Sequence, residues 1–99
     1  MAYNELLTNT IGGRTIQEIT PSAGLLQVTF TDGSVMKIKT GGPLPAADTL
    51  VGRTIKGVHQ ADTNMDLTFT DRTTGHIKLA EATSSVILRD KDGNFEYAD

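Results

Sequence analysis

Cysteine and tryptophan are both absent from the 99 residues of this chain. Without cysteine the chain has no disulfide, no thiolate ligand for zinc and no cysteine nucleophile. Aromatic residues make up only 5% of the sequence, so the core must be built mainly from Ile, Leu, Val and Met. A chain of this length buries roughly 60–70% of its unfolded surface, which favours a compact scaffold with shallow grooves over a deep catalytic cavity.

An excess of basic residues is also missing. Nine Lys and Arg face twelve Asp and Glu, for a formal net charge of −3. Nucleic-acid-binding domains are usually strongly basic, so nucleic acid is not an expected partner. No apolar run approaches the roughly 20 residues of a membrane span, and the N-terminus lacks the basic and apolar regions of a signal peptide. We therefore expect no membrane association and a cytoplasmic location.

One stretch of the chain occurs twice. Segment 13–32 returns as segment 52–71 without a gap; Gly-Arg-Thr-Ile opens both copies and Thr-Phe-Thr-Asp closes both. A repeat at a fixed spacing indicates duplication of one supersecondary unit. We predict a single domain over residues 1–99, with a first repeat at about 11–40, a linker at 41–49, a second repeat at about 50–80 and a C-terminal hairpin at 84–99.

Apolar residues alternate with polar ones inside each repeat, which predicts a half-buried strand. In the first repeat Asp32-Gly33 is a turn signal, and 35–39 follows as the return strand. The second turn is predicted at 71–75, two residues longer than the first. A bulge between Ile16 and Ile19 would bring both onto one face of an earlier strand. The residues expected to face the core are Leu26, Val28, Phe30, Met36, Ile38, Met65, Leu67, Phe69, Ile77 and Leu79.

Short helical turns are expected only before the repeats. Asn4 is a candidate N-cap for a turn that includes Leu6 and Leu7, and residues 45–48 favour a similar turn in the linker. Residues 21–24, Pro-Ser-Ala-Gly, predict a turn between the first two strands. The sequence Asp-Lys-Asp-Gly at 90–93 closes the C-terminal hairpin, whose arms carry Val86 and Leu88 on one side and Phe95 and Tyr97 on the other.

These features predict an all-β fold. Three short strands cannot bury both faces of their sheet, so two meanders related by an approximate twofold axis would share one core. We expect a tandem duplication of a three-stranded antiparallel meander that forms a small β-sandwich or a partly open barrel, with the C-terminal hairpin added and at most short helical turns.

Arg14 and Arg53 occupy equivalent positions in the two repeats. Two guanidinium groups close to a twofold axis could clamp a phosphate or a carboxylate. The alternative is that each arginine forms an ordinary ion pair with a nearby acid, which is common on protein surfaces.

No metal site or cofactor is predicted. His59 and His76 are the only histidines, and neither stands at a spacing that is typical of a metal site. The segment 90–94 resembles the start of a calcium loop, but its glycine falls at the fourth position rather than the sixth. A hydrolase built on either histidine would need a cleft that brings the ring within hydrogen-bond reach of a carboxylate.

Contact with another protein is the use that the strand faces favour. Uncharged strand faces tolerate a second protein, and the terminal hairpin carries aromatic residues. The candidate partner-contact residues are Thr29, Thr31, Thr68, Thr70, Phe95 and Tyr97.

The sequence thus favours a non-enzymatic binding or assembly module that acts through protein–protein contacts, with a homodimer expected. No serine lies in a Gly-x-Ser-x-Gly elbow, and no catalytic residue is predicted. The alternative is a protein that binds or sequesters a small, nucleotide-like anion through Arg14 and Arg53.

Overall fold

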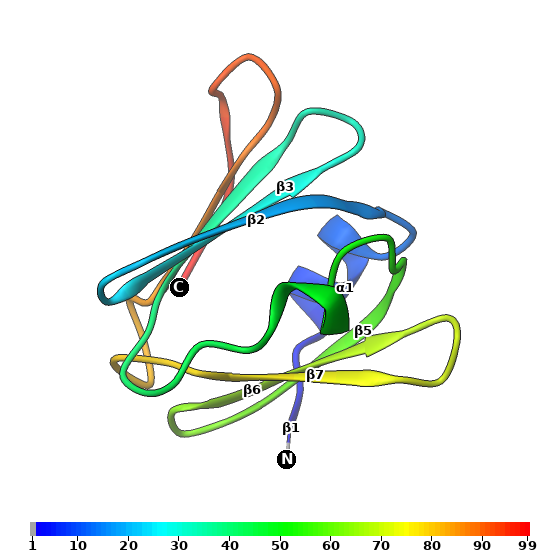
Figure 1. Cartoon of the computed structure of the whole chain (residues 1–99). Helices are drawn as coiled ribbons and strands as arrows, with labels where there is room; N and C mark the ends of the chain where they lie inside the picture. The colour runs from blue at the N-terminus through cyan, green and yellow to red at the C-terminus, as the bar shows by residue number, and fades with distance from the viewer. Residues whose placement is uncertain (1) are drawn as a thin grey trace.

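A computed structural model describes residues 2–99 as two antiparallel β-sheets with short helical segments between them (Figure 1). In chain order the elements are β1 (Ala2–Tyr3), α1 (Glu5–Ile11), β2 (Ile16–Ser22), β3 (Leu25–Phe30), β4 (Val35–Lys39), the 3-10 helix η1 (Ala47–Thr49), β5 (Ile55–Ala61), β6 (Asn64–Phe69), β7 (Thr74–Lys78), β8 (Val86–Arg89) and β9 (Phe95–Ala98).

The strands form a sandwich-like fold rather than a closed barrel. One sheet has the order β1-β5-β6-β7 and the other has the order β2-β3-β4-β8-β9. Figure 1 shows the two sheets as separate layers, with the linker and η1 crossing from one layer to the other. The prediction of an all-β fold is confirmed, and of the two arrangements expected the sandwich is the one observed.

The two meanders pair their strands in matching registers. Ile16 lies opposite Phe30 in the first, and Ile55 lies opposite Phe69 in the second. A register shift follows directly in both, between residues 16 and 18 and between residues 55 and 57. The predicted bulge is therefore present, and the second meander has its counterpart.

Reciprocal hydrogen bonds join the two halves. The Gly13 amide donates to the Ile55 carbonyl at 2.9 Å, and the Gly52 amide donates to the Ile16 carbonyl at 2.8 Å. Isolated bridges link Thr15 with Thr54 and residue 40 with residue 79, which are again equivalent positions. This reciprocity is what an approximate twofold axis produces; the duplication of the sequence that would explain it stays a prediction.

One apolar cluster lies between the sheets. All of the residues predicted to face the core belong to it, together with others from both sheets. Helix α1 adds Leu7 and Ile11, which are fully buried. The predicted cap is present, because the Asn4 side chain accepts a hydrogen bond from the Leu7 amide at 3.0 Å. The Thr8 hydroxyl accepts one from the Val58 amide at 2.9 Å, which fixes the helix against β5.

The prediction of a longer second hairpin is wrong. Thr29 pairs with Val35, and Thr68 pairs with Thr74, so the turns that follow β3 and β6 have equal lengths. Gly75 lies within β7 rather than in the turn. A Cβ atom at this glycine would stand 2.5 Å from Cδ2 of the buried Leu50, so packing of the core, not the turn, requires the glycine.

The first turn is shorter than the predicted turn at 21–24, and the C-terminal hairpin has a definite place in one sheet. Pro21 lies within β2, and the turn that follows contains only residues 23–24. Because β2 is an edge strand, the missing N–H of proline breaks no ladder there. The C-terminal hairpin extends the sheet of the first meander to five strands, since β8 pairs with β4 and β9 pairs with β8.

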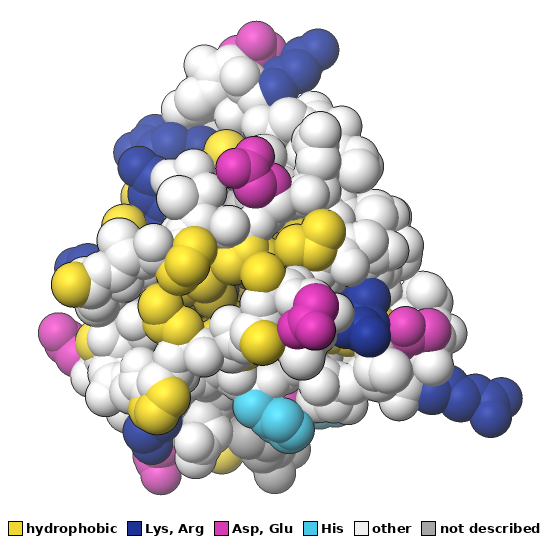
Figure 2. All heavy atoms as spheres, in the orientation of Figure 1, with side chains coloured by type: hydrophobic (Ala, Val, Ile, Leu, Met, Phe, Trp, Pro, Cys, Tyr) yellow, Lys and Arg dark blue, Asp and Glu magenta, His cyan; other side chains and the backbone are white. Residues whose placement is uncertain are grey.

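The linker between the repeats crosses the face seen in Figure 2, where apolar side chains gather with charged groups around them. Leu44 from this linker packs against the core, and Val51 just after η1 is 41% exposed. Among residues 2–99, no helix has the length and apolar character that crossing a membrane requires.

Candidate functional site

Arg14 is held by acids of its own chain. Its guanidinium donates to Oε2 of Glu96 at 2.6 Å and to the Ser34 hydroxyl at 3.0 Å, and its Nε lies 3.4 Å from Oδ2 of Asp32. Ser34 in turn donates to Asp32 at 2.5 Å. This hydrogen bond, with smaller help from the Arg14 charge, holds the pKa of Asp32 below its ordinary value.

Arg53 is bound in a similar way in the second half. Its Nε lies 3.2 Å from Oδ2 of Asp71, and its Nη1 donates to the Asp48 carbonyl at 3.0 Å. The Thr73 hydroxyl and amide both donate to Asp71, which lowers the pKa of that carboxyl. Both arginines thus occupy the ion-pair arrangement that was the alternative to a ligand clamp.

The candidate contact residues do not form one surface. Thr29 and Thr68 are half-buried on β3 and β6, while Thr31 and Thr70 are exposed just beyond the strand ends. Phe95 begins β9 and is 61% exposed.

Tyr97 belongs to the core rather than to an accessible surface. Only 6% of it is exposed, and Asn4 donates a hydrogen bond to its hydroxyl at 3.0 Å. Burial raises the pKa of this phenol. A partner could therefore contact Phe95 directly, but not Tyr97.

A catalytic histidine needs both a cleft and a carboxylate within hydrogen-bond reach, and each of the two histidines meets only one of these requirements. His76 lies 2.7 Å from the Asp66 carboxylate, but its side chain is 75% exposed on open surface. His59 lines a small hollow together with Lys56 and Phe69, and no carboxylate of the described residues 2–99 lines that hollow. Within residues 2–99, no group of three or more potential ligands is placed to hold a metal ion.

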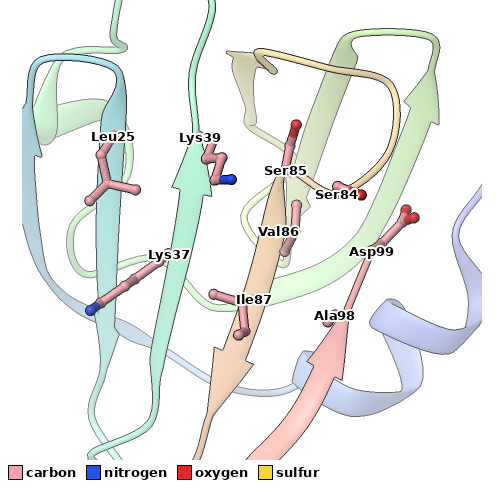
Figure 3. Close-up of a pocket in the computed structure, with 9 residues that line it drawn as sticks. All are labelled: Leu25, Lys37, Lys39, Ser84, Ser85, Val86, Ile87, Ala98 and Asp99. Carbon is pink, nitrogen blue, oxygen red and sulfur yellow. The ribbon is translucent and has the colours of Figure 1, made fainter.

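An open groove of about 600 Å³ lies on the outer side of the five-stranded sheet (Figure 3). Figure 3 shows Lys39 directing its amine toward Ser85, whereas the Lys37 amine points toward β3. The groove's lining is Leu25, Lys37, Lys39, Ser84, Ser85, Val86, Ile87, Ala98 and Asp99. Ser84 at its rim has a φ of 62°, a conformation that is costly for residues other than glycine.

The free edge of β7 is the second notable surface. Hydrogen bonds alternate along an antiparallel strand, so every second residue turns its backbone groups to the same neighbour. The carbonyl of Thr73 and the amide of Leu79 both bond to the β6 side. Residues 74, 76 and 78 therefore direct their backbone groups away from β6, where the sheet ends.

The equivalent edge in the other half is covered. Strand β4 corresponds to β7, and β8 pairs with it from Val35 to Ile38. The Lys39 amide, equivalent to that of Lys78, donates to the Ser85 carbonyl at 2.7 Å. In the second sheet no strand of residues 2–99 occupies this place, and only the carbonyl of Lys78 has a partner, the Gly41 amide at 3.0 Å.

Apart from its Lys78 end, where Gly41 and Gly42 of the linker lie against it, β7 lacks the protection that the other sheet edges carry. The edge of β5 is covered by β1, and the equivalent edge of β2 contains Pro21. Strand β9 lies against α1, and its pairing with β8 contains a register shift. Strand β7 has neither a proline nor a bulge. Sequence patterns did not indicate this edge, because they give the strands but not the order of the strands in a sheet.

No family model, no curated protein and no solved structure matches this chain.

Proposed function

We propose that this chain is a non-enzymatic binding module that acts through protein–protein contacts, and that β7 is the edge it uses. The observation that carries the proposal is the contrast between two equivalent strands: β4 is paired with β8, while no strand of residues 2–99 pairs with β7 on the same side. An unpaired strand edge is a template for another strand, because it offers a regular row of donors and acceptors.

The side chains of β7 support this use. Thr74, His76 and Lys78 lie on the outer face and are exposed, while Gly75 and Ile77 lie on the inner face and are buried. A strand added at this edge would continue both faces of the sheet without burying a charge in the core. The main chain would supply the affinity, and the outer side chains would supply the choice of partner.

The proposal is tested by removing one outward N–H. His76→Pro deletes the amide that points away from β6 and leaves the β6–β7 ladder intact. His76→Ala is the matched control, because it removes the ring but keeps the amide. We expect the immobilised wild-type chain and immobilised His76→Ala to retain the same protein partner. His76→Pro should lose this partner, although its thermal unfolding stays cooperative. Equal retention by all three chains would contradict the proposal.

A second candidate function is the binding of a small anion with an apolar body in the groove of Figure 3. Arg14 and Arg53 are engaged by acids, whereas Lys37 and Lys39 form no ion pair with any of residues 2–99. These lysines stand over a half-buried floor that includes Ile87. Binding pockets commonly combine such an apolar floor with a few charged groups.

This second candidate is tested by thermal unfolding with a series of aliphatic carboxylates. A ligand at 100 times its Kd stabilises the folded chain by about 2.7 kcal/mol. We expect a rise in Tm that Lys37→Gln/Lys39→Gln abolishes and that Lys56→Gln, on the other sheet, leaves unchanged. If nucleotides rather than carboxylates raise the Tm, and Arg14→Ala/Arg53→Ala abolishes that rise, the anion binds at the two arginines and not in the groove.

A further inference from the structure

We infer that the strand which completes the β7 edge is β7 of a second copy of this chain, paired antiparallel across a twofold axis. The inference rests on the proposed function, because it names the partner for the same edge. It joins two four-stranded sheets into one continuous sheet through backbone hydrogen bonds.

The open backbone groups of β7 are self-complementary. Residues that face outward can pair only with residues that face outward on the other strand. Centring the pair on His76 places it opposite His76 of the second copy, and places Thr74 opposite Lys78 of the second copy. The His76 amide and carbonyl then bond reciprocally, and each Lys78 amide reaches a Thr74 carbonyl.

One of the outward groups is already occupied. The Lys78 carbonyl accepts the Gly41 amide at 3.0 Å, so of the six bonds that the three residue pairs could form, the two from the Thr74 amides to the Lys78 carbonyls are set aside and four remain. The register thus uses outward groups that have no partner within residues 2–99.

Side chains on both faces are compatible with the pairing. On the outer face each Lys78 meets the uncharged Thr74, so no two lysines stand directly opposite each other. The two His76 rings meet at the axis, and Nδ1 of each ring lies 2.7 Å from Oδ1 of its own Asp66, which holds the ring in place. On the inner face Gly75 meets Ile77, a small residue opposite a large one.

The pairing of β8 with β4 within the chain is an example of the same kind of contact. It shows that a strand lies antiparallel on the equivalent edge, with residues 35–38 in register with residues 86–89. The edge is only five residues long, so the interface is small and the dimer should depend on concentration.

Single-cysteine variants test the inference sharply, because the natural chain has no cysteine and any disulfide must join two chains. Cα atoms of a hydrogen-bonded antiparallel pair lie about 5.5 Å apart, within disulfide range. We expect His76→Cys to form a covalent dimer rapidly under mild oxidation. Lys37→Cys is the matched control, since it holds the equivalent position on β4, where β8 already lies.

Asp66→Cys gives a second control. It lies one strand further from the edge, so its two copies would be about 14 Å apart at strand spacings of about 4.8 Å. A disulfide cannot bridge that distance without movement of the backbone. Wild-type chain should also shift from monomer to dimer with rising concentration in light scattering, and His76→Pro should stay monomeric.

The outcomes separate this inference from the proposed function. Two results together overturn the inference that the partner is a second copy. His76→Cys would cross-link no faster than Lys37→Cys, and the wild-type chain would stay monomeric at high micromolar concentration. If wild-type chain then still retains another protein that His76→Pro loses, the β7 edge binds a different partner and the proposed function stands. If it retains none, both proposals fall.

Discussion

The hydroxyl oxygens of Thr15 and Thr54 lie 2.7 Å apart where the two halves of the chain meet. Both residues are half-buried, and each follows the arginine of a Gly-Arg-Thr-Ile sequence. Thr15→Val should cost about 1–2 kcal/mol, because the Thr54 hydroxyl is left without its partner. Adding Thr54→Val should cost little more, since both polar groups are then gone. Urea denaturation of the four chains measures this coupling, and additive losses would show that the hydrogen bond contributes nothing.

Replacing Arg72 with glycine should stabilise the chain. Arg72 has a φ of 72°, and its equivalent in the first half is Gly33 with a φ of 89°. Relief of the left-handed strain, about 1–2 kcal/mol, is partly offset by the greater freedom of glycine in the unfolded chain. We expect a net gain of about 0.5 kcal/mol in urea denaturation.

The reverse change at the equivalent turn is the control for Arg72. Gly33→Ala should destabilise the chain, because a Cβ atom there has the wrong φ and stands 2.8 Å from Cβ of Lys91. A chain that gains stability from Gly33→Ala, or loses it from Arg72→Gly, would contradict the strain argument.

Gly75→Ala should destabilise the chain by about 1–3 kcal/mol, as overpacking of a core usually does. The added methyl would stand 2.5 Å from Cδ2 of Leu50 and 3.4 Å from the Phe69 ring. Leu50→Ala alone should cost about 2–5 kcal/mol, because it leaves a cavity. The double variant should cost less than the sum, since the new methyl occupies part of that cavity; additive losses in denaturant unfolding would contradict the contact.

Acid should destabilise the chain through the carboxyls beside the two β-hairpin turns. Hydrogen bonds from Ser34 to Asp32 and from Thr73 to Asp71 lower the pKa values of these carboxyls below 3.8. A lowered folded pKa contributes stability that is complete above the unfolded value and is lost as the pH falls through the folded value. We therefore expect stability from these groups to be constant at neutral pH and to decline below about pH 4.

The Ser34→Ala variant tests the cause of this acid dependence. It removes the largest contribution to the low pKa of Asp32, so the titration of that carboxyl should move upward toward 3.8. An NMR titration of the aspartate carboxyls measures the shift, with Asp71 as the internal reference that should not move. An unchanged Asp32 titration would show that Arg14 rather than Ser34 controls this group.

The alternation of apolar and polar residues predicted most of the fold correctly, because burial of one sheet face requires a period of two. Leu26, Val28 and Phe30 are all fully buried, as their spacing indicates. The helix cap at Asn4 was also predictable, since capping depends on residues that are close in the sequence. These are local rules, and they apply to each element separately.

Contacts between distant elements could not be predicted in this way. The preference of glycine for turns places Gly75 in the predicted turn at 71–75, but packing against Leu50 requires this glycine within a strand. Glu96 binds Arg14 across 82 positions of sequence, and no pattern in either segment indicates it. The β7 edge, too, depends on strand order, which is set by how the two sheets pack.

Pro21 gives the open edge of β7 a further consequence. It lies on the edge of the other sheet at the position equivalent to Gln60, and it offers no N–H to an incoming strand. Two molecules joined through β7 would leave no open edge at that strand, while Pro21 makes the β2 edge of the other sheet a poor template for a further strand. The assembly would stop at a pair, and the same chain with an ordinary residue in place of this proline would be exposed to open-ended stacking into fibres.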